Sequence, residues 1–181
     1  MNNIFLKGKT IYFRPLEQKD LTMEYVSWMN DSEVCQFNSH STFPYTIEKS
    51  EAYYQHLQQS ANTIIALAII DISSNKHIGN ISLQGINWIN NSAEFAIILG
   101  DKSFWGRGVA SEAFFLMFDY GFTRLNLHRI YYGTSSKNLA VHKLAVKMKM
   151  TQEGIRKEAM FKNGEYVDII EYGVLKNDFL K

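Results

Sequence analysis

A single cysteine, Cys35, is present among the 181 residues. The chain can therefore form no internal disulfide, and it offers too few thiolates for a cysteine-based zinc site. We expect Cys35 to be a small buried side chain, as most free cysteines are. Only two prolines occur, Pro15 and Pro44, and no Pro-, Gly- or Ser-rich linker or repeat divides the chain. The sequence therefore predicts a single domain over residues 1–181.

Long apolar runs and an excess of one charge are also missing. The longest apolar stretch, residues 64–70, is strand-sized, and the N-terminal residues lack the basic and then apolar pattern of a signal peptide. The formal net charge is +1, which argues against a dedicated nucleic-acid binder but allows a locally positive site. The five histidines show no metal-binding spacing such as H-E-x-x-H. We expect a cytoplasmic protein that has no metal site and that binds neither nucleic acid nor a membrane.

The N-terminal third of the chain predicts a short strand followed by two helices. Residues 9–13 are typical of a strand that Pro15 ends. The next helix has its apolar residues at i, i+4, i+7 and i+8, counted from Leu21. Asp20 comes directly before this helix, so we expect its carboxylate to be the N-cap. A second helix is expected from Thr46, with glutamates in its first turns.

After residue 60, strands and helices alternate. Residues 93–99 are nearly all apolar, which indicates a central strand. A helix over 110–120 joins this strand to the next one, and such a βαβ unit makes the two strands parallel. The sequence thus predicts an α/β fold with a mixed sheet. The expected elements are strands 63–71, 77–83 and 93–99, helix 110–120, strand 129–134, helix 138–148, and a hairpin of 155–161 with 166–175.

The segment between strand 93–99 and the following helix contains Gly106 and Gly108 with one residue between them. Glycine permits a positive φ and a close approach of the backbone to a ligand, and a helix N-terminus attracts anions. Arg107 adds positive charge there. The pattern predicts a cradle for a pyrophosphate, with a plain turn as the alternative. A Walker loop is absent, and the dinucleotide fingerprint is incomplete because its third glycine is Ser111.

The stretch from Phe104 to Ala113 reads FWGRGVASEA and resembles the YWGKGYATEA of GNAT acetyltransferases, in the branch of the ribosomal-protein N-terminal (Rim-type) acetyltransferases. Further matches follow in order and cover essentially the whole chain. They are FRPL at 13–16 with Asp20, WMNDSEV at 28–34, IGNI at 78–81, LNLHRI at 125–130, Asn138, and the last segment from Glu153 to Tyr172. The resemblance implies a GNAT-like acyl-CoA N-acyltransferase fold.

The resemblance also implies that acetyl-CoA is the cosubstrate. Backbone N–H groups from Gly106 to Ala110 would bind its pyrophosphate, and strand 93–99 would bind the pantetheine arm where this strand splays from 129–134. Asn138 would contact the arm or the sulfur region, which also makes it a catalytic candidate. The expected cofactor-binding residues are Ile98, Leu99, Gly106, Arg107, Gly108, Val109, Ala110, Ser111 and Asn138.

Four places depart from the family pattern, and one of them is residues 147–150, which read KMKM where relatives usually have KLGF. The residue two places before the first glycine is Phe104, where relatives often carry a basic residue or glutamine. Many relatives carry a tyrosine general acid seven residues after the asparagine, and this chain has Ala145 there. A serine found three residues after the asparagine is Val141. The donor of a proton to the leaving thiolate is therefore unassigned.

Acetyl transfer requires an uncharged amine, yet an amine of lysine type is mostly protonated at neutral pH. Glu94 is the first candidate for the base, with a plain strand-edge carboxylate as the alternative. Backbone N–H groups near Ile98 would polarise the thioester carbonyl. We expect His142 to be a solvated helix residue. The expected acceptor-binding residues are Trp28, Tyr45, Tyr166 and Asp168, with core packing as the alternative for Trp28 and turn stabilisation for Asp168.

We therefore expect an acetyl-CoA-dependent N-acetyltransferase that acts on a primary amine. The acceptor stays open among a protein N-terminus, an amino sugar, a polyamine and another small amine. A sugar or free peptide amine is favoured over an assembled ribosome, because the chain has no basic stripe for RNA. A non-catalytic acyl-CoA-binding module and a nucleotide-binding domain are the alternatives. A homodimer also stays open.

Overall fold

The computed structural model describes residues 3–181. The first two residues of the stretch considered above for a signal peptide lie outside the described residues.

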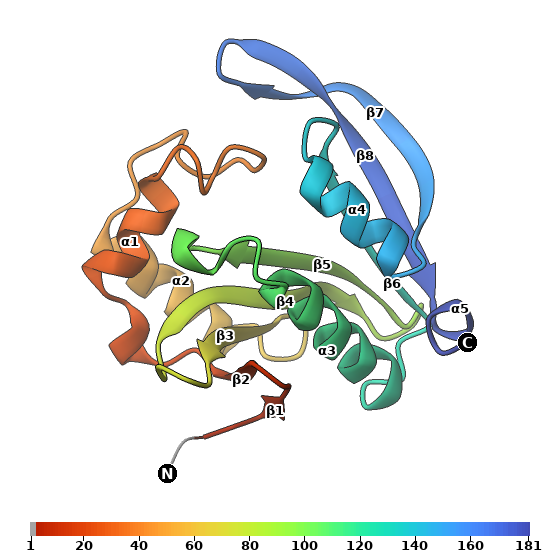
Figure 1. The fold of residues 1–181 in the computed structure, drawn as a ribbon, viewed down its shortest axis with the longest axis horizontal. Helices are drawn as coiled ribbons and strands as arrows, with labels where there is room; N and C mark the ends of the chain where they lie inside the picture. The colour runs from red at the N-terminus through yellow and green to blue at the C-terminus, as the bar shows by residue number, and fades with distance from the viewer. Residues whose placement is uncertain (1–2) are drawn as a thin grey trace.

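The described chain forms a sheet of eight strands with helices on both faces (Figure 1). The strands are β1 (Leu6–Lys7), β2 (Ile11–Pro15), β3 (Ile65–Asp71), β4 (His77–Asn87), β5 (Ser92–Leu99), β6 (Arg129–Ser135), β7 (Thr151–Lys162) and β8 (Glu165–Leu175). The helices are α1 (Met23–Asn30), α2 (Ile47–Gln59), α3 (Val109–Thr123), α4 (Leu139–Lys147) and α5 (Lys176–Phe179). No helix within residues 3–181 is long and apolar enough to cross a membrane.

The sheet is mixed, which confirms the prediction from the sequence. Its strand order is β1-β2-β3-β4-β5-β6-β8-β7, and neighbouring strands are antiparallel except for the parallel pair β5 and β6. β5 is an interior strand, as its apolar sequence predicted. α3 connects β5 to β6, because parallel neighbours need a crossover. The two strands pair only over Ser92 to Glu94 and Arg129 to Tyr131, and in the described chain they form no further pair beyond that point.

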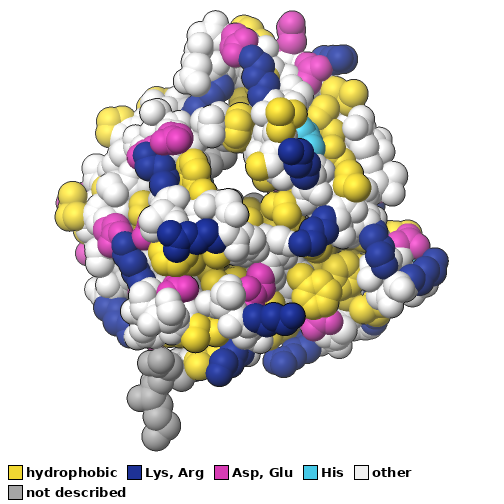
Figure 2. Space-filling model, viewed as in Figure 1, with side chains coloured by type: hydrophobic (Ala, Val, Ile, Leu, Met, Phe, Trp, Pro, Cys, Tyr) yellow, Lys and Arg dark blue, Asp and Glu magenta, His cyan; other side chains and the backbone are white. Residues whose placement is uncertain are grey.

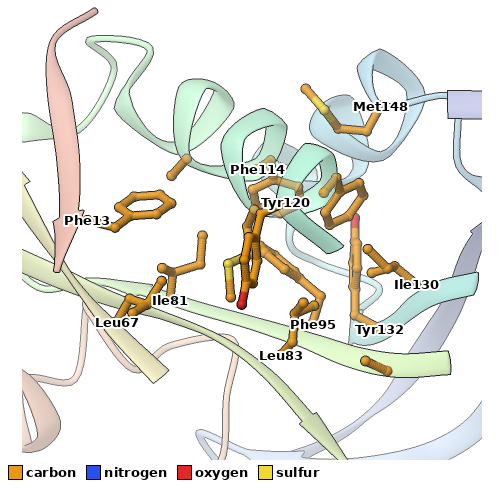
Figure 3. Close-up of a cluster of buried hydrophobic side chains, with 14 of the residues drawn as sticks. Phe13, Leu67, Ile81, Leu83, Phe95, Phe114, Tyr120, Ile130, Tyr132 and Met148 are labelled. Atoms are coloured by element: carbon orange, nitrogen blue, oxygen red, sulfur yellow. The ribbon is translucent and has the colours of Figure 1, made fainter. Parts of the chain in front are cut away.

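The main core lies between the sheet and α3 (Figure 3). α3 buries Ala113, Phe114, Met117 and Phe118, because positions three or four residues apart share one face of a helix. The rings of Phe114 and Phe118 contact Phe95 of β5, with centroids 4.3 and 5.0 Å apart. Full burial of one such side chain is worth about 2–3 kcal/mol. This packing holds the start of α3 close to the end of β5.

A second layer, formed by α1 and α2, covers the opposite face of the sheet. Trp28 of α1 is buried there, and Ile98 of β5 packs against the cluster to which Trp28 belongs. The neighbours Ile97 and Leu99 pack against the main core instead. Adjacent residues of β5 therefore face opposite layers, as the strand pleat requires. Cys35 is fully buried, as expected, and its Sγ donates a hydrogen bond to the carbonyl of Trp28 at 3.2 Å.

Asp20 is not the N-cap of α1, so that expectation was wrong. Thr22 is the cap, and its hydroxyl accepts a 3.2 Å hydrogen bond from a backbone N–H of the first turn. Asp20 is buried, and its carboxylate accepts two 2.6 Å hydrogen bonds from Arg14 of β2. Burial alone would raise the pKa of Asp20, but the hydrogen bonds from Arg14 and from the backbone N–H of Glu17 lower it. The predicted start of α2 is confirmed, with Thr46 as its N-cap.

Candidate active site

A cavity of about 630 Å³ opens where β5 and β6 diverge. Its walls come from the loop after α1, from β5, from the segment between β5 and α3, from β6 and from α4. Figure 2 shows the molecule hollowed near the middle of this face, with hydrophobic side chains around the opening. The predicted site residues that line the cavity are Glu94, Ile98, Leu99, Gly106, Gly108, Val109, Ala110, Ser111 and Asn138. The fold thus brings together candidates from separate parts of the sequence.

The glycines of the predicted cradle have the backbone that the prediction required. Gly106 has a φ of 73° and Gly108 a φ of 82°, both in the left-handed region that favours glycine. Gly108 is the N-cap of α3 and supplies no side chain to its free N–H groups. A Cβ added at either glycine would meet no atom within 4 Å, so both backbones face open space. A pyrophosphate fits this arrangement, because its oxygens can accept from the exposed N–H groups.

Basic side chains lie near the cradle. Arg107 is exposed and does not line the cavity, and its guanidinium lies 5.4 Å from the centroid of the Phe104 ring. The Nζ of Lys147 donates a 2.6 Å hydrogen bond to the hydroxyl of Ser111. Lys143 of α4 lines the cavity. These positive charges favour a phosphate group at the start of α3.

Within the described part of the chain, residues 95–99 of β5 are paired on one side only. β4 pairs with β5 along this length, for example at Gly79 with Leu99. On the other side the pairing with β6 stops at Glu94 and Tyr131, and the cavity begins there. An extended chain with amide groups can hydrogen-bond to such a free strand edge. The pantetheine arm of CoA is a chain of this kind, so the cavity fits it as well as the phosphates.

Glu94 lies at the fork between the two strands. Its side chain is exposed, and within residues 3–181 its carboxylate forms no hydrogen bond or ion pair. The neighbour Phe95 points into the main core, so Glu94 points to the opposite face of the sheet. A free carboxylate at this place can attract a cationic amine and accept a proton from it.

Asn138 is the N-cap of α4. Its Oδ1 accepts a 3.3 Å hydrogen bond from the N–H of Val141, and its Nδ2 donates to the hydroxyl of Thr134 at 3.1 Å. These bonds tie the start of α4 to β6 beside the cavity. Each end of the Asn138 amide thus makes one hydrogen bond within the protein and keeps one further donor or acceptor position.

The four residues predicted to bind the acceptor do not line the cavity. Trp28 is buried in the α1 cluster, which agrees with the core-packing alternative, and Tyr45 packs against the same cluster. Tyr166 is exposed near the tip of the β7–β8 hairpin. The carboxylate of Asp168 pairs with the Nζ of Lys157 at 2.9 Å and accepts from a backbone N–H of β7 at the same distance. Asp168 thus stabilises the hairpin in this structure.

Two features of the site were missed in the sequence. Tyr132 of β6 lines the cavity, and its ring lies 6.0 Å from that of Phe95. Alternation along β6 places Tyr131 and Tyr132 on opposite faces of the sheet, but it does not say which of them faces the core. His142 is not simply solvated, since its Nδ1 lies 3.0 Å from the hydroxyl of Tyr172 and its Nε2 lies 3.1 Å from the carbonyl of Ser136. Both ring nitrogens are therefore held by protein groups.

Comparison with known proteins agrees with this geometry. The family described as "Acetyltransferase (GNAT) domain" matches residues 10–151. The chain is 28% identical over 172 residues to the spermidine N(1)-acetyltransferase of Escherichia coli (strain K12). This match covers 94% of this chain and 89% of that protein. It is 30% identical over 181 residues to the probable N-acetyltransferase YjcK of Bacillus subtilis, and this match covers 96% of this chain and 98% of that protein.

A solved structure gives the same picture in three dimensions. The crystal structure of spermidine N-acetyltransferase from Vibrio cholerae in complex with CoA and spermine superposes with a TM-score of 0.86. It shares 28% sequence identity, and the match covers 95% of this chain and 99% of that one. The likeness therefore extends over nearly the whole of both chains.

Proposed function

Because this chain belongs to the acetyltransferase (GNAT) family, it is an acetyl-CoA-dependent N-acetyltransferase, and we propose that its acceptor is a polyamine of the spermidine or spermine class. The observation that carries the proposal is the free carboxylate of Glu94 at the fork of β5 and β6. A polyamine carries several positive charges along a flexible chain, and a carboxylate without a partner attracts such a cation.

The loop after α1 supplies a second carboxylate to the same cavity. Glu33 lines the cavity, and its carboxylate pairs with the Nζ of Lys102 at 2.9 Å. The Glu33 side chain is 59% exposed, so an amine can approach its outer oxygen. Two carboxylates at separate points suit an acceptor whose charges are separated by a methylene chain.

Residues at one end of the cavity bind acetyl-CoA, and residues at the other end bind the acceptor amine. Backbone N–H groups from Gly106 to Ala110 bind the pyrophosphate, and the free edge of β5 binds the amide groups of the arm, including N–H groups near Ile98. Acetyl-CoA, when bound, supplies the activated acetyl group. Glu94 attracts the acceptor amine and takes its proton, and Asn138 holds the start of α4 in place. Trp28 and Tyr45 support the wall formed by α1, and Tyr166 and Asp168 support the hairpin above it.

The motifs resemble the ribosomal branch of the family, yet we favour a polyamine over a ribosomal protein. The relatives named above that match nearly the whole chain include an enzyme named for spermidine and a structure that binds spermine. The net charge of +1 also gives no general attraction to RNA. We place the reaction in the cytoplasm, where both proposed substrates are present.

A panel of amines tests the proposal through the release of free CoA thiol. The panel contains spermidine, spermine, putrescine, glucosamine and a short peptide with a free N-terminus. We expect kcat/KM for spermidine or spermine to exceed that for the sugar and the peptide at least about tenfold, which corresponds to about 1.4 kcal/mol. We also expect the polyamine KM to rise with ionic strength, because exposed charges are screened by salt. A higher kcat/KM for the peptide or the sugar would overturn the polyamine assignment.

A further inference from the structure

The leaving thiolate has no proton donor at the position where many relatives carry a tyrosine. Ala145 occupies that position on α4 and is fully buried in the main core. A methyl group can donate nothing, so a side chain that protonates the leaving sulfur must come from another element. The donor must reach the cavity close to the fork of β5 and β6, where the acetyl group meets Glu94.

Tyr132 is the phenol near this fork that lines the cavity. It directly follows Tyr131, which forms the last pair between β6 and β5. Its ring lines the cavity and packs between Phe95 and Phe114, with centroid distances of 6.0 and 5.9 Å. Figure 3 shows the ring standing up from β6 with its hydroxyl at the end toward α4.

The hydroxyl of Tyr132 reaches the helix on which the usual tyrosine is missing. It donates a hydrogen bond to the carbonyl of Val141 at 3.4 Å, which is long for an O–H donor and therefore weak. Val141 lies one turn before Ala145, and Tyr132 and Ala145 belong to the same buried cluster. The hydroxyl of Tyr132 therefore reaches, from β6, the part of the cavity that a tyrosine at position 145 would reach from α4.

The other hydroxyls of the cavity are less suitable donors. The hydroxyl oxygen of Thr134 accepts a hydrogen bond from Asn138, and that of Ser111 accepts one from Lys147. Both are aliphatic alcohols, which are weaker acids than a phenol. Burial raises the pKa of Tyr132, and the nearby Tyr172 raises it further through electrostatic repulsion. The Tyr132 hydroxyl therefore stays protonated through the physiological range.

We propose that Tyr132 is a catalytic residue that donates its hydroxyl hydrogen to the thioester sulfur as the carbon–sulfur bond breaks. Glu94 takes a proton from the amine while the carbon–nitrogen bond forms, and the electron pair of the broken bond goes to sulfur. The Tyr132 proton then goes to that sulfur, and Tyr132 regains a proton from water while Glu94 releases one. The proposal rests on acetyl transfer to an amine and does not depend on which amine is the acceptor.

The opposite faces of the sheet support this division of roles. Phe95 and Tyr132 face the main core, so Glu94 faces the other side of β5. The acceptor therefore approaches Glu94 from one face, and the sulfur meets Tyr132 from the other. The two groups lie at the same fork and do not compete for one position.

Tyr132→Phe tests the proposal, with Tyr172→Phe as the matched control. Each change removes one phenolic oxygen from neighbouring rings, whose centroids are 5.7 Å apart, but Tyr172 does not line the cavity. We expect Tyr132→Phe to lower kcat about 10- to 100-fold with any amine that the wild type acetylates, while Tyr172→Phe stays within about threefold. The affinity for acetyl-CoA should be nearly unchanged in both variants.

A binding measurement gives a second readout that needs no amine. Calorimetry compares CoA with desulfo-CoA, which lacks the sulfur. We expect the wild type and Tyr172→Phe to prefer CoA about 3- to 10-fold, and Tyr132→Phe to lose this preference. A Tyr132→Phe variant with wild-type kcat would overturn the proposal, and so would a slow variant that keeps the full preference for CoA. If the enzyme acetylates other amines but not polyamines, the polyamine assignment fails, and the kcat comparison and the calorimetry still test Tyr132.

Discussion

Replacing Gly108 by alanine tests the phosphate cradle, because the structure separates the strain of the change from its effect on the ligand. Gly108 has a φ of 82° and a ψ of −3°. An added Cβ meets no atom within 4 Å, so the free protein suffers only the backbone strain of a left-handed alanine. That strain is about 1–2 kcal/mol. For a chain of this size it lowers Tm by roughly 2–8 °C.

The larger effect appears when acetyl-CoA is present. At about 100 times its Kd, the ligand adds about 2.7 kcal/mol to the wild type, which raises Tm by roughly 5–11 °C. The methyl group of Gly108→Ala occupies the open space in front of the helix N–H groups, where phosphate oxygens must approach. A 100-fold loss of affinity leaves about 0.4 kcal/mol at the same ligand concentration. The acetyl-CoA shift should then fall to about 1–2 °C.

Gly164→Ala is the matched control. Gly164 has a φ of 85°, a Cβ there also meets no atom within 4 Å, and the residue lies in the turn between β7 and β8. We expect this variant to show the same loss of Tm without ligand but the full shift with acetyl-CoA. Thermal unfolding of the three proteins with and without ligand is the assay. If Gly108→Ala keeps the full shift, the two glycines only shape a turn and the cradle is wrong.

Three further changes probe the base, the loop above the cavity and the buried ion pair. Glu94→Gln should lower kcat about 100-fold or more with unchanged acetyl-CoA affinity, because the amide keeps the shape but takes no proton; equal rates across pH would make Glu94 structural. Lys162→Met should raise the acceptor KM several-fold, because its Nζ ties the carbonyls of Asn38 and His40 to the hairpin at 3.1 and 2.9 Å; an unchanged KM would contradict this. Asp20→Asn should cost about 3–5 kcal/mol of unfolding free energy at neutral pH, because it leaves a buried guanidinium without its partner. The pKa of Asp20 is lowered on folding, so its contribution is complete above about pH 4 and is lost as the pH falls below that value, whereas the Asn variant should show no such loss.

Much of the fold could be predicted because periodicity reports which face of an element is buried. The apolar repeat of α3 and the apolar run of β5 gave both elements and their parallel crossover correctly. The error at Asp20 has a physical cause. A carboxylate before an apolar repeat can cap a helix or pair with a distant arginine, and only the chain path that brings Arg14 beside it decides between them. The cap in the structure is Thr22, two residues later.

The cofactor half of the site was more accessible to sequence reasoning than the acceptor half. Gly106 and Gly108 lie directly before a predicted helix, where glycine permits the positive φ that the structure shows at both residues. The acceptor side depends on where exposed side chains of distant elements meet, and short-range patterns do not report this. Asp168 illustrates the difficulty, since its carboxylate is satisfied by Lys157 and by a backbone N–H of β7.

The register between β5 and β6 explains why the phenol at the fork was invisible in the sequence. Alternation assigns Tyr131 and Tyr132 to opposite faces of β6, but it does not say which residue stands opposite Glu94. In the structure Tyr131 is paired with Glu94, so Tyr132 is the first residue beyond the pairing and faces the core side. A shift of one residue would exchange the two faces and put Tyr131 over the cavity. The separation of a base and a proton donor onto two faces of one fork is therefore a property of strand register, which no single segment of the sequence contains.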